Sequence, residues 1–259
     1  MIRIHSILNM KNNWLVQQLR LSVFPEAETS DASIDLWPVL GGLEKEKQTI
    51  DSKTGTITYE GIYMDFKLIL VVNPVKVDLI LTVPNRASIE NNKTVMNYLG
   101  TFSEGLKIFQ PIVETWFANK FPEVKRLAFG AQLMKEMTSR EEVYKYLSQY
   151  IPFVLDPKKM SDFNLQLNLL TKSQQVKDLG LNRLSKWNSL KVTPELSVVG
   201  NPKTSHEYPT INLCHLELDI NTSQENKEKI DKKVLTPLYA ELVSLGAEIS
   251  EKGVIDHAN

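Results

Sequence analysis

The sequence predicts an α+β fold, built mainly from antiparallel strands with two long helices. Segments in which apolar and polar residues alternate, as in a strand with one buried face, precede a long helical pattern, and this order occurs twice. No Gly-rich linker separates the two occurrences. We therefore expect two related halves that share one core, residues 1–122 and 123–259, or a single domain formed by both.

The composition is that of an ordinary globular protein. Hydrophobic residues make up 42% of the 259 residues and charged residues 24%, and the formal net charge is -1. A near-neutral chain has no global attraction to nucleic acid or to an anionic membrane. The N-terminal apolar run is too short for a secretion signal, and no stretch approaches the roughly 20 apolar residues of a membrane span. We expect a cytoplasmic protein that does not bind membranes.

Strands dominate the first half. Residues 14–24 alternate between apolar and polar side chains, and residues 56–64 are rich in Thr, Ile and Tyr. Residues 65–72 and 75–83 flank Asn73–Pro74, a pair that favours a turn, so these segments predict a hairpin. Both arms are apolar at nearly every position, which predicts a hairpin that is central in its sheet or covered on both faces.

The second half repeats this pattern with a short helix inserted. Strands are predicted at residues 125–134, 163–169 and 211–220. Residues 138–150 carry a capping signature followed by a short helical pattern. The Asn and Gln side chains of residues 163–169 predict an ordinary outer sheet face rather than a polar pocket. Such a face suits a partner, because amides cost less to desolvate than charged groups.

A long helix is predicted at the end of each half. Apolar residues recur at steps of three and four over residues 95–116, and Pro122 would end that helix. Thr222 with Glu225 predicts the start of the last helix, and Gly246 its C-terminal end.

Each predicted helix contains a proline, Pro111 in the first and Pro237 in the second. Proline is rare there because it costs about 3 kcal/mol in a helix interior. When the two prolines are aligned, the apolar positions around them also correspond. This coincidence predicts a diverged internal duplication.

The best candidate for a metal site lies on the last predicted strand. His215, Glu217 and Asp219 are spaced by two, so they point to one face at intervals of about 6.8 Å. Imidazole and carboxylate groups bind divalent ions, but ligands of one ion lie no more than about 4 Å apart. We favour the interpretation that these residues cover the polar side of an amphipathic strand. We expect no metal and no other cofactor.

Nucleophilic catalysis has little support. Cys214 alternates onto the apolar face of the same strand, where burial raises the pKa of a thiol, and His215 points to the opposite face. The sequence contains no nucleophile elbow, no phosphate-binding loop and no dinucleotide-binding fingerprint. We therefore favour a protein that is not an enzyme.

One basic set with an aromatic residue is a candidate for contact with a partner or with nucleic acid: Lys172, Lys177, Arg183, Lys186 and Trp187. Basic side chains bind phosphates, and an aromatic ring stacks on a base. The surrounding residues 173–187 fit a helix and a loop equally. We favour a solvated connection with Trp187 as a hydrophobic plug, because the chain is nearly neutral.

Three short motifs of the second half are similar to those of a scattered family of uncharacterised bacterial proteins of this approximate length: Arg126–Gly130, Leu181–Trp187 and Leu216–Ile220. The resemblance implies an α+β fold. It implies no activity and no catalytic residues.

The lack of a catalytic constellation predicts a non-enzymatic binding or interaction protein, such as an accessory or immunity-type factor of a bacterial system. Its expected partner is a protein. The first alternative is a ligand-binding domain that encloses an apolar cavity for a small apolar ligand. The second is a metal-dependent hydrolase that uses His215, Glu217 and Asp219. The sequence carries no signal for the oligomeric state.

Overall fold

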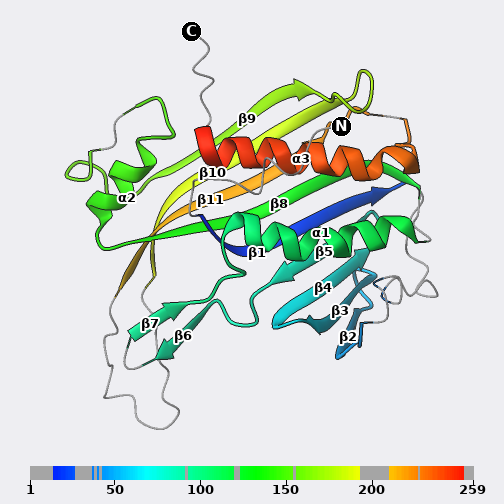
Figure 1. Ribbon diagram of the computed structural model, residues 1–259, viewed down its shortest axis with the longest axis horizontal. Helices are drawn as coiled ribbons and strands as arrows, with labels where there is room; N and C mark the ends of the chain where they lie inside the picture. The colour runs from blue at the N-terminus through cyan, green and yellow to red at the C-terminus, as the bar shows by residue number, and fades with distance from the viewer. Residues whose placement is uncertain are drawn as a thin grey trace.

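Alternation of apolar and polar residues forms long strands that pair into one sheet. Its strands are β1 (Leu15–Pro25), β2 (Lys47–Asp51), β3 (Thr56–Tyr63), β4 (Phe66–Asn73), β5 (Lys76–Thr82), β8 (Val124–Met137), β9 (Asn164–Lys172), β10 (Gly180–Val192) and β11 (Ile211–Thr222). They lie in the order β2-β3-β4-β5-β1-β8-β11-β10-β9 (Figure 1), and every pairing is antiparallel. The predicted α+β class with a mainly antiparallel sheet is confirmed.

The structure is a computed structural model. It describes residues 14–26, 37, 40, 43–90, 93–119, 123–153, 156–192, 210–226 and 228–253.

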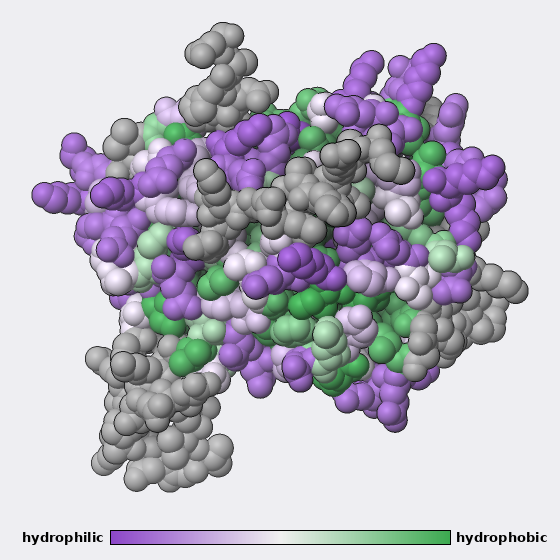
Figure 2. All heavy atoms as spheres, in the orientation of Figure 1, coloured by the Kyte–Doolittle hydropathy of each residue, from purple (hydrophilic) through white to green (hydrophobic). Residues whose placement is uncertain are grey.

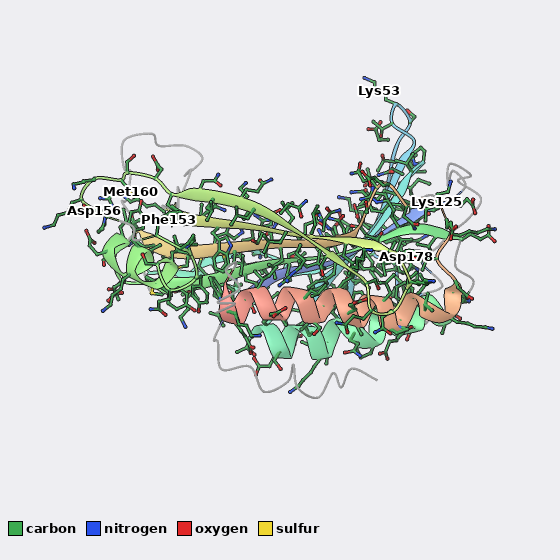
Figure 3. The ribbon with its side chains drawn as sticks, turned by 90° about the horizontal axis from the view of Figure 1, so that it is seen from above. Lys53, Lys125, Phe153, Asp156, Met160 and Asp178 are labelled. Atoms are coloured by element: carbon green, nitrogen blue, oxygen red, sulfur yellow. The ribbon has the colours of Figure 1, made fainter. Side chains whose placement is uncertain are left out.

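Three helices accompany the sheet: α1 (Phe102–Ala118), α2 (Arg140–Leu147) and α3 (Lys232–Lys252). The long helices α1 and α3 lie side by side on one face of the sheet (Figures 1 and 3). We call the opposite face, on which no described helix lies, the distal face. A separate hairpin is formed by β6 (Ala87–Glu90) and β7 (Lys93–Met96). No helix in the described part of the chain is long and apolar enough to cross a membrane.

The core fills the space between the sheet and the two long helices. The ring of Phe129, on β8, lies 6.3 Å from that of Phe102 in α1 and 6.0 Å from that of Tyr239 in α3. Gly246 allows α3 to approach the sheet closely, because a Cβ there would lie 3.2 Å from the Phe129 ring. Alternate residues of the central strands point to this core, so their neighbours point to the distal face. Figure 2 views the molecule from the helix side.

The first long helix begins later than the apolar spacing predicts. Residues 95–96 belong to β7. Gly100 has a φ of 101°, a left-handed conformation that prevents the helix from extending to this residue. Thr101 is the N-cap: its side chain accepts a hydrogen bond from the Glu104 backbone N–H, and the Glu104 carboxylate accepts one from the Thr101 N–H. This capping box starts α1. The helix ends before Pro122, which lies outside the described residues.

The predicted limits of the last helix are wrong at both ends. Thr222 is buried at the end of β11, and its hydroxyl oxygen accepts a hydrogen bond from the Leu127 N–H. Asp231 caps α3 instead. Gly246 lies in the helix interior, where it serves close packing, and Gly253, with a φ of 83°, is the C-cap.

The two parts of the chain share the order of four strands, and the first part has the additional edge strand β2. In the first part, β1 pairs with the last strand of the meander β3-β4-β5, and in the second, β8 pairs with the last strand of β9-β10-β11. A long helix follows each meander, and both helices lie on the same face (Figure 3). Because β1 also pairs with β8, one continuous sheet joins the two predicted halves. The duplication itself stays a prediction.

Candidate functional site

A hollow of about 620 Å³ lies on the distal face, over the strands β1, β8, β11 and β10. Its floor is low because Ser22 and Ala128, which are direct partners across β1 and β8, have small side chains. Longer side chains surround this floor, including Phe24, Lys76, Arg126, Asn168, Asn182, Leu184 and Asp219. The volume suits a small ligand or a few side chains of a partner protein.

A row of hydrogen-bonded side chains runs along the hollow from the sheet edge to the sheet centre. Asn168 of β9 donates to Asn182 of β10 over 3.1 Å, and Asn182 donates to Asn221 of β11 over 3.0 Å. Asn221 donates to Oδ1 of Asp219 over 3.0 Å, and Arg20 of β1 donates to Oδ2 of the same carboxylate over 3.2 Å. Both carboxylate oxygens of Asp219 are therefore engaged. The row links side chains from four strands.

Gly130 makes the contact between Arg20 and Asp219 possible. It lies on β8, directly between these two residues in the strand register. A Cβ at this position would lie 3.1 Å from Nε and from Nη2 of Arg20. Because glycine has no Cβ, the guanidinium passes over β8 and reaches a carboxylate that is 199 residues away in sequence.

Arg126 is a cation of the hollow that has no carboxylate partner among the described residues. Its guanidinium carbon lies 4.3 Å from the centre of the Phe24 ring, and its Nε donates to the Thr222 carbonyl oxygen over 3.2 Å. Its terminal nitrogens Nη1 and Nη2 have no hydrogen-bond partner in the part of the chain that the structure describes. Partial burial lowers the pKa of Arg126, and the Asp219 carboxylate opposes this effect. The group still stays charged, because the ordinary pKa of arginine is far above neutral.

The remaining cation of the hollow is neutralised within the protein. Nζ of Lys76 lies 2.7 Å from Oδ2 of Asp78, and the Ser22 hydroxyl donates to Oδ1 of that carboxylate over 2.5 Å. Asp78 is buried. Lys76 is thus held on β5 beside the hollow with its charge balanced.

The three residues considered as metal ligands share the distal face of β11, but their surroundings differ. Asp219 belongs to the hydrogen-bonded row. Glu217 lies opposite Lys186 of β10 in the strand register. His215 contacts the side-chain amide of Asn188 through Nδ1 at 3.1 Å. Within the described residues, no group of three or more His, Cys, Asp or Glu side chains could hold a metal ion.

His215 lies on the distal face with Glu217 and Asp219, as predicted, but it is half-buried. Burial, with a smaller contribution from Lys186 and Arg86, lowers the pKa of its imidazole to about 4. Its Nε2 is buried and has no hydrogen-bond partner among the described residues. Its direct partner on β8 is Met134, which belongs to a second apolar cluster with Met96 of β7 and Leu213 of β11.

The basic set does not form one surface. Trp187 is fully buried on the helix side of the sheet, where its ring stacks on Tyr150 at 5.3 Å. This agrees with the interpretation of Trp187 as a plug. Arg183 lies on the same side of β10 and pairs with Glu248 of α3 at 3.2 Å. Neither side chain can join a contact on the distal face.

The three lysines of the set are also separated. Residues 180–192 form a strand, so Lys186 points to the distal face, away from Trp187. Lys172 ends β9, and Lys177 lies in the turn before β10. The sequence spacing suggested one patch because it carried no information on how a strand would divide these residues between two faces.

Sequence reasoning missed Arg20, Arg126 and Gly130 as residues of a site. A glycine in a strand interior often marks a close approach of another group, and Gly130 carried that signal. Asn168 lay on the predicted amide face, and its position in the hollow fits the polar-pocket alternative for that face.

The hollow is lined mainly by hydrogen-bonding side chains. It is lined by amide, hydroxyl and guanidinium groups, and its best-placed carboxylate, that of Asp219, is already hydrogen-bonded on both oxygens. Comparisons with protein-family models, with curated proteins and with solved structures found no match. The geometry of the hollow is therefore the basis for assigning a function.

Proposed function

We propose that this protein is a non-enzymatic binding protein and that its distal face binds a protein partner. The hollow at Ser22 and Ala128 carries this proposal, because it is a polar depression whose side chains are already held in place. Side chains that are ordered before binding lose little conformational entropy when a partner docks. Figure 3 shows the β2–β3 hairpin, with Lys53 at its tip, rising on the distal side and flanking this face.

The alternatives receive less support from the described residues. A hydrolase would need carboxylates free to bind a metal or to move a proton, whereas both oxygens of Asp219 are engaged. An apolar ligand would need an apolar cavity, and the space between α1 and α3, near Tyr239, measures about 20 Å³. That volume is close to the size of one water molecule.

The proposal is tested with variants that fill the hollow. Asn168→Trp and Leu184→Trp place bulk at its rim, and Lys107→Trp places the same bulk on the exposed surface of α1 as a matched control. We expect a protein that co-purifies with the wild type in its native host to be lost with both rim variants and retained with the control. Thermal melts of all variants check that the fold is intact. Retention of that protein by folded rim variants would contradict the proposal.

A further inference from the structure

We infer that the hollow binds an oxyanion, a carboxylate or phosphate group of its ligand, through the terminal nitrogens of Arg126. This inference rests on the proposed function and names the chemistry that the hollow recognises. Three cations line the hollow: Arg20, Lys76 and Arg126. Arg20 pairs with Asp219 and Lys76 pairs with Asp78. Arg126 forms no ion pair with a described carboxylate, and Asp219 acts on it only at longer range.

The second carboxylate that lines the hollow, Glu225, does not change this conclusion. It is exposed, and no ion pair within 4.0 Å joins it to Arg126. Its backbone N–H is bound by the Ser223 hydroxyl, which places it in the turn after β11. A ligand anion therefore does not have to displace a described carboxylate that is ion-paired to Arg126.

The guanidinium of Arg126 is held in an orientation that suits such a ligand. The Phe24 ring supports one face of the guanidinium, and the Thr222 carbonyl oxygen binds Nε. These two contacts leave Nη1 and Nη2 as a rigid pair of donors. Two parallel N–H groups of arginine match the two oxygens of a carboxylate or phosphate.

Other donors of the hollow lack partners as well. Nε of Arg20 is buried and has no hydrogen-bond partner among the described residues. Asn182 and Asn221 each donate one N–H within the row, and a side-chain amide has two. Nε of Arg20 has almost no accessible surface, so a ligand with several acceptor oxygens would accept from the free N–H groups of Asn182 and Asn221 instead. An oxyanion is the simplest group of this kind.

The test is a titration of the full chain with sodium phosphate and with sodium acetate, each against sodium chloride at equal ionic strength, followed by calorimetry or by amide chemical shifts. We expect saturable binding of at least one of the two anions. Arg126→Met keeps the length of the side chain and should weaken this binding at least tenfold. Arg126→Lys keeps the charge but lacks the paired donors, so it should recover only part of the affinity. Lys125→Met is the matched control, because it removes the neighbouring cation and should bind as the wild type does.

The two anions distinguish the source of the oxyanion. Saturation with phosphate alone assigns a phosphate group, and saturation with acetate alone assigns a carboxylate. The inference is overturned if chloride competes equally with both, if neither anion binds, or if folded Arg126→Met and Lys125→Met lose affinity to the same extent.

Failure of this inference differs from failure of the proposed function. If the rim variants lose the co-purifying protein while Arg126→Met binds anions as the wild type does, the distal face binds a partner by other contacts. If anions bind through Arg126 while the rim variants keep the partner, the hollow is a small-molecule site and the proposed function is wrong.

Discussion

We expect the half-buried His215 imidazole to make the stability of the fold depend on pH. Its pKa in the folded protein is about 4, below the ordinary 6.5, so the unfolded chain takes up this proton first as the pH falls. We expect the stabilisation to be complete above pH 6.5, to decrease between pH 6.5 and 4, and to level off below that. The loss should be on the order of 3 kcal/mol. Urea unfolding at several pH values measures it.

His215→Gln is the control for this prediction, since it keeps a polar side chain beside Asn188 but cannot titrate. Both proteins contain the same carboxylates. Subtracting their unfolding free energies at each pH therefore leaves the contribution of His215. A difference that does not change between pH 7 and 4 would show that His215 is not buried as described.

Cys214 directly precedes His215, lies on the opposite face of β11, and is predicted to be an unreactive thiol. Its burial is confirmed: the side chain is inaccessible, and Sγ donates to the Val143 carbonyl oxygen over 3.7 Å. Burial raises the pKa of the thiol to about 12, so almost no thiolate exists at neutral pH. A thiol reagent should label the native protein slowly and the urea-unfolded protein rapidly. Cys214→Ser should lower the free energy of unfolding by about 1–3 kcal/mol.

At the scale of elements, a buried carboxylate of α3 holds the turn between β9 and β10. Glu241 accepts hydrogen bonds from the Ser173 hydroxyl over 2.6 Å and from the Gln174 N–H over 2.7 Å, and it is 4% exposed. Glu241→Ala leaves both donors without a partner, so we expect a loss of about 1–3 kcal/mol of unfolding free energy. Glu241→Gln keeps an acceptor oxygen and should cost less.

The matched control for Glu241 is Glu248→Ala on the same helix. Glu248 pairs with Arg183 and Lys252 and is more exposed, so its loss should cost less than about 1 kcal/mol. Urea titrations of the three variants give the comparison. Equal, small losses for Glu241→Ala and Glu248→Ala would mean that the turn does not depend on this carboxylate.

At the scale of the whole molecule, an internal duplication requires the strand order that β3-β4-β5-β1 and β9-β10-β11-β8 share. Superposition of residues 14–121 on residues 125–246 should therefore overlay both long helices and at least three strands with the same connectivity.

The pairing of β1 with β8 leads to a second prediction. Co-expressed fragments 1–122 and 123–259 should purify as one complex, because each alone exposes a long strand edge. Fragments that each stay monomeric and folded would contradict a shared sheet.

Much of the secondary structure follows from local pattern. The alternation in β1, β8, β9 and β11 and the turn at Asn73–Pro74 identify strands and their two faces, because side chains on a strand alternate with a period of two. The start of α1 could also be predicted from the sequence, because Thr101 and Glu104 form a capping box. The apolar spacing, which begins earlier, obscured this signal. Thr222 with Glu225 shows the limit of such signals. The same pattern occurs there, but the hydroxyl of Thr222 is used by Leu127.

By itself, the sequence determined the fold class, the strand faces and the burial of Cys214 and Trp187, because these depend on the order of neighbouring residues. Tertiary structure decided which strands became neighbours, and hence the hollow. Arg20 and Asp219 meet only because β1, β8 and β11 lie in that order and Gly130 leaves space between them. Contacts between residues so far apart are set by the packing of the whole sheet against α1 and α3, and no local periodicity encodes that packing.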